Sequence, residues 1–238
     1  MNDELMNSES NAAVIAPPPL TIERMALGPM QNFVYLLVPT QRGRLAVVDP
    51  AWEPDQILAR ADELQRPVTD IVLTHHHPDH RNGVEALLAR YPARIHVMRA
   101  EQPWLKGHGW LADCVLHAPG DTLELGGGAN VQLLHTPGHT PGSQCLLCRD
   151  PAGDKLLTGD TLFIDGCGRC DLPGGDPKLL FESLHCTLAK LSGSTRVLPG
   201  HDYAPSPEAT LQDQLVSNPY LKLATVDDFV AYRMHGRT

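Results

Sequence analysis

Long hydrophobic runs are missing from this sequence, and so are the marks of an export signal. No segment approaches the roughly 20 consecutive apolar residues of a membrane-spanning helix. Residues 1–16 are acidic and polar, without the basic start and apolar stretch of a secretory signal peptide. We therefore expect no membrane partner and a cytoplasmic location, where thiols stay reduced. The six cysteines are then expected to be free thiols and not a disulfide framework.

Basic residues are also scarce. The sequence holds 19 Lys and Arg against 28 Asp and Glu, which gives a formal net charge of −9. That balance argues against nucleic acid as a partner, because binding to phosphates requires an excess of positive charge. Hydrophobic residues make up 42% of the 238 positions, which is enough to bury a sizeable core.

The order of apolar runs and turns indicates one domain behind a short leader. Residues 1–19 end in three prolines and predict an extended, disordered leader, and residues 20–238 predict a single domain. Apolar runs predict strands at 33–38, 45–48, 71–73, 94–98, 131–134, 144–147, 155–157 and 196–198. Helical spacing predicts helices at 55–64, 84–91, 177–191, 211–216 and 226–234. This alternation favours an α/β or mixed α+β class.

Histidine is plentiful and clustered. The chain has 12 histidines, and the segment Thr74-His75-His76-His77-Pro78-Asp79-His80 holds four of them directly after a predicted strand. Two histidines one residue apart can converge on one metal ion while His76 points away. Asp79 and His80 follow on the turn and can reach a second ion nearby.

Three later segments offer further ligands of the same kind. His139 lies in Thr136–Gly142, Asp160 in Thr158–Thr161 and His201 in Leu198–Tyr203. Each segment follows a predicted strand and carries a glycine-bearing turn, so the four loops can meet at one edge of a fold. A lone histidine is usually structural, but seven candidates in this order predict a metal site.

This ordered set resembles the metallo-β-lactamase superfamily from about Leu20 onward. Residues 160–169 resemble the glyoxalase II and persulfide dioxygenase branch within it. The resemblance implies an α+β fold, an αβ/βα four-layer sandwich. It also implies two ligand sets bridged by Asp160: His75, His77 and His139 for the first metal, and Asp79, His80 and His201 for the second.

A dinuclear hydrolase is the function that this resemblance favours. Two divalent ions, zinc by preference with iron or manganese tolerated, lower the pKa of bound water for attack on a thioester or related acyl substrate. Asp79 would both bind metal and orient the nucleophile. Arg169 is expected to bind an anionic group of a small-molecule or thiol-carried substrate, and Tyr203 to donate a hydrogen bond to it.

Two other functions stay open. Gly168–Leu172 and Pro199–Tyr203 resemble persulfide dioxygenases, which use one non-haem iron; its ligands here would be His75, His139 and Asp160. A non-catalytic binding protein on the same fold is the other alternative, although such proteins usually lose ligands and none is lost here. The Arg-x-x-Lys-Asp pattern that accompanies glutathione binding in glyoxalase II is absent from residues 229–238.

The cysteines provide a competing metal motif. Cys145, Cys148, Cys167 and Cys170 have the spacing C-x2-C-x18-C-x2-C, which can mark a structural zinc site. The first pair, however, lies in an apolar strand without the turn of a zinc knuckle, and alternation along a strand separates its side chains. We therefore expect Cys145 and Cys148 to be buried as small apolar residues. A redox role for the second pair is the minor alternative.

Overall fold

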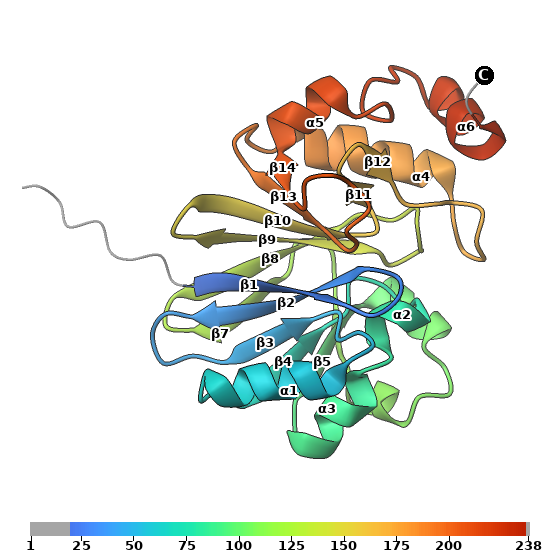
Figure 1. Cartoon of the computed structure of the whole chain (residues 1–238). Coiled ribbons are helices and arrows are strands. Elements are labelled where there is room, and N and C mark those ends of the chain that lie inside the picture. The colour runs from blue at the N-terminus through green and yellow to red at the C-terminus, as the bar shows by residue number, and fades with distance from the viewer. Residues whose placement is uncertain (1–19, 237–238) are drawn as a thin grey trace, which may run out of the picture.

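Two six-stranded sheets lie face to face at the centre of the structure (Figure 1). The computed structural model describes residues 20–236, so the predicted leader over residues 1–19 lies outside the described residues. The first sheet has the order β1-β2-β3-β4-β5-β6: Leu20–Leu27, Asn32–Pro39, Leu45–Val48, Val68–Val72, Arg94–Met98 and Val115–His117. The second has the order β14-β13-β10-β9-β8-β7: Ala209–Thr210, Arg196–Pro199, Gly153–Gly159, Gln144–Asp150, Ala129–His135 and Thr122–Gly126.

Both sheets are mixed, and their parallel pairs place several strand ends at one edge. Strands β3 to β6 are parallel neighbours, and in the second sheet β10 and β13 are parallel. Parallel neighbours need a crossover connection. Helix α1 (Pro54–Glu63) connects β3 to β4, and α2 (Pro78–Arg81) with α3 (Val84–Arg90) connects β4 to β5. Loops that follow these strands therefore emerge on the same side.

Alternation along β2 shows how the layers are held together. Phe33, Tyr35 and Leu37 belong to the apolar cluster between the two sheets, which the second sheet completes with residues such as Leu133. The intervening side chains of β2 pack in the outer cluster with Ile57 of α1. All eight residues of β2 are buried, as expected for a strand covered on both faces.

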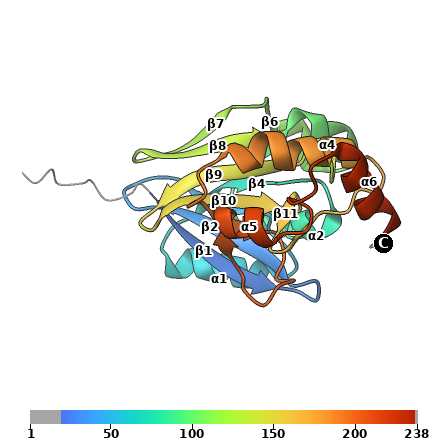
Figure 2. The same cartoon turned by 90° about the horizontal axis from the view of Figure 1, so that it is seen from above.

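Helices cover the outer face of the second sheet as well. Helices α4 (Pro177–Glu182), α5 (Leu211–Ser217) and α6 (Val226–His235) lie over it, as the view from above shows (Figure 2). They share a third apolar cluster with that sheet, which includes Leu180, Leu211 and Phe229. The order of layers is helix, sheet, sheet, helix, so the predicted αβ/βα four-layer sandwich is confirmed.

The element predictions differ from the structure at identifiable places. The helix predicted over 177–191 is an α-helix only to Glu182; a π segment at Ser183–Thr187 and a 3-10 turn at Leu188–Lys190 follow. The Ser183 hydroxyl donates to the Pro137 carbonyl at 2.7 Å, which ties this segment to the loop that carries His139.

Several strands escaped prediction. They are β1, β6, β7, the two-residue β14 and the small hairpin of β11 (Leu162–Phe163) with β12 (Gly166–Cys167). Strand β4 begins at Val68, whereas the prediction began at residue 71. The prediction began late because the polar Asp70 interrupts the apolar run. Asp70 is nevertheless fully buried, since Arg94 and His96 donate to its carboxylate. No helix within residues 20–236 is both long enough and apolar enough to cross a bilayer.

Candidate metal centre

The structure brings all seven predicted ligand residues to one place. The loop after β4 carries His75 and His77, and α2 follows it at the edge where the two sheets meet (Figure 1). The remaining candidates lie on α2 itself and on the loops that follow β8, β10 and β13: Asp79, His80, His139, Asp160 and His201. Residues up to 126 positions apart in the sequence, from His75 to His201, thus share one site.

Three histidine nitrogens form the first group. His75 Nε2 lies 3.0 Å from His77 Nδ1, which lies 2.9 Å from His139 Nε2. The ligand atoms of these three residues all lie within 4.8 Å of one another. Imidazole nitrogens crowded in this way repel as lone pairs unless a proton or cation lies between them, so the donor set suits a metal ion.

Asp79, His80 and His201 form the second group. His80 Nε2 lies 3.1 Å from His201 Nε2. Asp79 Oδ2 lies 3.4 Å from His80 Nε2 and 3.5 Å from His201 Nε2. Two imidazoles and one carboxylate within 4.8 Å of one another are again a usual ligand set for a divalent ion.

Asp160 lies between the two groups. Its Oδ1 lies 3.3 Å from His80 Nε2 and 3.4 Å from His201 Nε2, whereas Oδ2 lies 3.5 Å from His139 Nε2. Oδ1 is buried and accepts no hydrogen bond from the residues that the structure describes. A buried carboxylate oxygen needs a partner, and cations placed in the two groups would provide one.

Hydrogen bonds on the far side of the rings orient the histidines. His80 Nδ1 donates to Asp49 Oδ2 at 2.9 Å, His139 Nδ1 to the Arg169 carbonyl at 2.8 Å, and His201 Nδ1 to the Met30 carbonyl at 2.9 Å. Each bond places a proton on Nδ1 and directs Nε2 toward the site, as in histidines that bind metal.

Asp49 was not predicted as a site residue. Its carboxylate accepts the Thr74 backbone N–H at 2.7 Å and the Thr74 hydroxyl at 2.6 Å, in addition to the bond from His80. The Thr74 hydroxyl in turn lies 3.0 Å from His75 Nδ1. Asp49 thereby positions one residue of each ligand group. Its sequence signal was a charged residue directly after the apolar strand Leu45–Val48.

The histidines differ in the charge that they carry. Burial and the neighbouring histidines lower the pKa of His77 to about 4, so its ring is neutral and free to bind metal. Burial also opposes charge on His80, but Asp160 and the hydrogen bond to Asp49 raise its pKa to about 9. For Asp160, the positive charges around it outweigh burial and hold its pKa well below the usual range.

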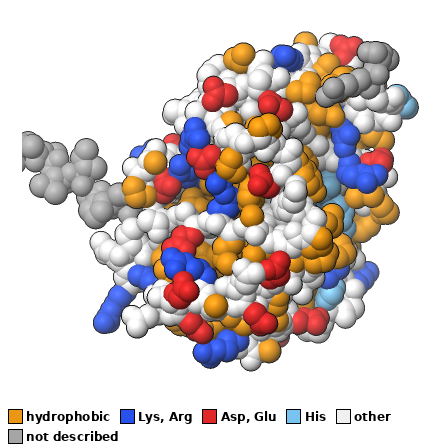
Figure 3. Space-filling model, viewed as in Figure 1, with side chains coloured by type: hydrophobic (Ala, Val, Ile, Leu, Met, Phe, Trp, Pro, Cys, Tyr) orange, Lys and Arg blue, Asp and Glu red, His pale blue; other side chains and the backbone are white. Residues whose placement is uncertain are grey.

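A pocket of about 430 Å³ opens above the two groups. Its floor is formed by metal-ligand candidates and its walls by Met30, Pro78, Phe163, Cys167, Arg169, Leu172, Tyr203 and Arg233. Histidine side chains show at the surface on the right of Figure 3, where the upper and lower layers meet. The pocket thus combines a polar floor with apolar and cationic walls.

Both predicted substrate residues line this pocket. The ring of Tyr203 stacks on His201 at 4.6 Å, and burial with the nearby carboxylates raises its pKa to about 12, so its hydroxyl remains a donor. Arg169 is half-exposed, and its guanidinium makes two bonds to Asp171, at 2.9 and 2.7 Å. That pairing occupies two of the N–H groups of the Arg169 guanidinium.

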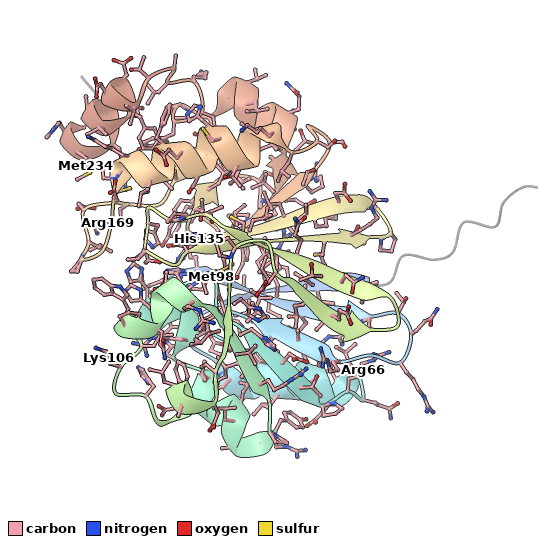
Figure 4. All side chains as sticks on the ribbon, turned by 180° about the vertical axis from the view of Figure 1, so that it is seen from behind. Arg66, Met98, Lys106, His135, Arg169 and Met234 are labelled. Carbon is pink, nitrogen blue, oxygen red and sulfur yellow. The ribbon has the colours of Figure 1, made fainter. Side chains whose placement is uncertain are left out.

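A second arginine on the pocket wall was missed. Arg233 lies on α6, and its Nε donates to the Gly168 carbonyl at 2.9 Å. Within residues 20–236 no carboxylate forms an ion pair with it. Figure 4 shows Arg169 on a loop close to the helix end that carries Met234. Contact across 65 positions gives no local sequence signal, which is why Arg233 was not predicted.

The cysteines do not gather as a metal site. Cys145 packs in the cluster under the outer helices, whereas Cys148 packs between the sheets, so the two point to opposite faces of β9. Both are buried, as predicted for small apolar side chains. All six cysteines are free thiols, and none belongs to a potential metal-ligand group within the described part of the chain.

Comparison with known proteins fits this geometry. Residues 27–201, which span all seven candidates, match the model of the metallo-beta-lactamase superfamily. The chain belongs to the metallo-beta-lactamase superfamily. It is 32% identical over 202 residues to the probable polyketide biosynthesis zinc-dependent hydrolase BaeB of Bacillus velezensis, covering 85% of this chain and 87% of that protein.

Two further similar proteins belong to the two groups that the sequence resembles, glyoxalase II and persulfide dioxygenase. A hydroxyacylglutathione hydrolase of Anaeromyxobacter dehalogenans is 41% identical over 180 residues, which cover 73% of this chain and 62% of that protein. The crystal structure of ETHE1 from Myxococcus xanthus superposes with a TM-score of 0.79 at 27% identity, covering 90% of this chain and 89% of that one. The similarity therefore extends to both the hydrolase and the ETHE1 side of the branch.

Proposed function

We propose that this protein is a metal-dependent hydrolase that cleaves thioesters or related acyl substrates at a dinuclear site. The observation that carries the proposal is the position of Asp160 between two complete ligand groups, with Oδ1 facing one and Oδ2 facing the other. Two divalent ions, zinc by preference, fit these donors; iron and manganese tolerate the same residues. The names of hydrolase relatives support the same assignment.

The catalytic roles follow from the positions of the side chains. When bound, the cations would supply Lewis acidity that brings the pKa of a water molecule close to neutral. Asp79 lines the pocket, and its Oδ2 accepts a hydrogen bond from the Asn32 amide at 3.1 Å, which holds the carboxylate at the pocket floor. A carboxylate oxygen of Asp79 would orient the water and take its proton, so that no Ser or Cys nucleophile is needed.

The pocket walls indicate what the substrate looks like. Met30, Phe163 and Leu172 provide apolar contacts that suit an acyl chain. Tyr203 would donate a hydrogen bond, and Arg233 with Arg169 would bind an anionic group on the thiol carrier. The proposed substrate is therefore a small, thiol-carried acyl compound with a negative charge.

Thioester cleavage tests this function directly. We expect zinc-loaded protein to release thiol from acyl thioesters, measured with a thiol-reactive dye, and chelation to abolish the release. Asp79→Asn should lose most of the rate, because general-base assistance contributes about 100- to 10,000-fold. Because Asp79 also belongs to the second ligand group, the rate is compared per bound zinc ion. A zinc-loaded protein with no activity on any acyl thioester would contradict the proposal.

A persulfide dioxygenase is the second candidate, favoured by the similarity to ETHE1. It would use one iron held by His75, His139 and Asp160. The second ligand group distinguishes the two candidates: Asp79, His80 and His201 are fully assembled here, and a mononuclear centre would leave them without an ion. Oxygen uptake with a persulfide substrate, in iron-loaded protein, would favour this candidate over the hydrolase.

A further inference from the structure

Glu101 is a buried carboxylate that lies behind the first ligand group. It follows β5 at the start of the 3-10 segment Arg99–Trp104, and only 1% of its surface is exposed. Glu101 does not line the pocket of about 430 Å³, so it cannot contact substrate there. A buried carboxylate is costly unless its oxygens are bonded, and both of these oxygens are.

The two oxygens of Glu101 bind two different ligand loops. Oε2 accepts from His76 Nδ1 at 2.8 Å, and Oε1 accepts from the Thr140 hydroxyl. His76 stands between the ligand candidates His75 and His77, and Thr140 directly follows His139. A single carboxylate therefore joins the two segments that carry the whole first group.

The surrounding hydrogen bonds determine which group donates at each step between Ser143, Thr140 and Glu101. The Thr140 backbone N–H donates to Ser143 Oγ at 3.1 Å, and the two hydroxyl oxygens lie 2.7 Å apart. Since the Thr140 proton is directed to Glu101, the Ser143 hydroxyl donates to Thr140. His76 is held from its other side, because its ring stacks on Trp104 at 5.1 Å with an angle of 18° between the planes.

Close packing prevents the link from moving. A Cβ atom at Gly142 would lie 2.5 Å from the Glu101 nitrogen and 2.7 Å from its Cγ. Only glycine therefore lets the turn after His139 approach Glu101 so closely.

We propose that Glu101 is a positioning residue of the metal centre: by bonding His76 and Thr140, it fixes the spacing of His75, His77 and His139 and places a negative charge behind the first cation. This inference rests on the proposed metal site. In this proposal His76 has a role of its own: it binds no metal, and its ring bonds Glu101 instead. Residues that orient ligands in this way typically change metal affinity by about 10- to 100-fold when they are replaced.

Two variants separate the charge from the hydrogen bond. Glu101→Gln removes the charge and one of the two acceptors, because the amide oxygen can accept from one donor and the NH2 group from neither. Thr140→Val removes one hydroxyl donor and keeps the charge. Asp70→Asn is the matched control, because Asp70 is equally buried. Its carboxylate is bonded by His96 and Arg94, neither of which lies on a loop that carries a ligand candidate. It should alter stability without altering metal affinity.

The experiment is a zinc titration of each variant against a competing chromogenic chelator, with urea unfolding as the check of fold. We expect one of the two zinc affinities to fall by about 10- to 100-fold in Glu101→Gln, and less in Thr140→Val, with a changed visible spectrum when Co²⁺ replaces Zn²⁺. Unchanged affinity in both variants, or an equal loss in Asp70→Asn, would overturn the positioning role. If Glu101→Gln does not fold, Thr140→Val alone decides. Wild-type protein that binds no zinc would instead contradict the metal site itself.

Discussion

His77 Nδ1 lies 2.9 Å from His139 Nε2, across 62 positions of the sequence. His139 donates from Nδ1 to the Arg169 carbonyl, so its Nε2 faces His77. Burial lowers the pKa of His77 to about 4, so that ring is neutral at neutral pH. The same geometry recurs between His80 and His201 at 3.1 Å. Ligand nitrogens crowded in this way suit cations, one in each group.

Metal removal should therefore destabilise the protein. An ion that binds only the folded state at 1,000 times its Kd adds about 4 kcal/mol. For a chain of this size, that corresponds to a rise in Tm of roughly 8–16 °C for each site. We expect chelated protein to melt lower by that amount and zinc to restore it, as followed by circular dichroism. Equal Tm values with and without chelator would argue against a resident metal.

The ligand variants should fall into distinct classes. Asp160→Ala should lose both ions, because one carboxylate oxygen of Asp160 faces each ligand group. His139→Ala should lose mainly the first ion and His201→Ala mainly the second. Metal content after gel filtration measures this. Equal losses in all three variants would refute the bridging role of Asp160.

The two pocket arginines should differ in their effect. Arg169 is already bonded twice to Asp171. Arg233 donates from Nε to the Gly168 carbonyl and lies over the Tyr220 ring, without an ion pair to a carboxylate of residues 20–236, so its charge is more available to a substrate anion. Losing such a charge-assisted bond costs about 1.5–3 kcal/mol, or roughly 10- to 150-fold in kcat/KM. We expect Arg233→Ala to show this loss, mostly as a higher KM for anionic thioesters, and Arg169→Ala to show a smaller one.

Neutral thioesters provide the control for that comparison. Their hydrolysis should be unaffected by Arg233→Ala, and metal content should stay the same. Arg233→Lys should rescue only in part, because a point charge does not reproduce the two-pronged bond of a guanidinium. If kcat/KM falls equally for neutral and anionic thioesters, Arg233 acts by holding the Gly168 loop and does not bind substrate.

The cysteines should be mostly unreactive in the folded protein. Burial raises the pKa of Cys145 to about 11 and those of Cys148 and Cys170 to about 12. Cys186 is the exposed thiol. A thiol-specific reagent at pH 8 should therefore label Cys186 first, and the buried thiols only after unfolding. Fast labelling of Cys167 or Cys170 would revive the redox alternative for that pair.

The residues that gather at the candidate metal centre could be selected from the sequence because their signal is local. His75, His77, Asp79 and His80 occupy one short segment, and each later ligand follows an apolar strand and carries its own glycine turn. The resemblance to a known family then supplied the four-layer arrangement, which no spacing could have given. Strand and helix positions followed from apolar periodicity wherever one face of the element is buried.

The residues that support the site have no such signal. Asp49 and Glu101 are single carboxylates whose partners lie 25 or more positions away in the sequence. Their role in holding the ligand loops can be recognised only in the folded structure. Arg233 reaches the pocket because α6 packs on α4, a tertiary contact that composition does not reveal. Asp70 misled the prediction of β4 for the same reason, since its buried ion pairs come from distant segments.

The metal content of protein purified without chelator tests the central claim most directly. Elemental analysis, combined with parallel assays of thiol release and oxygen uptake, distinguishes the two candidate chemistries in one preparation. A dinuclear hydrolase predicts about two divalent ions per chain, with thioester cleavage and no consumption of oxygen. A single tightly held iron per chain, with oxygen uptake on glutathione persulfide and no thioester cleavage, would contradict it.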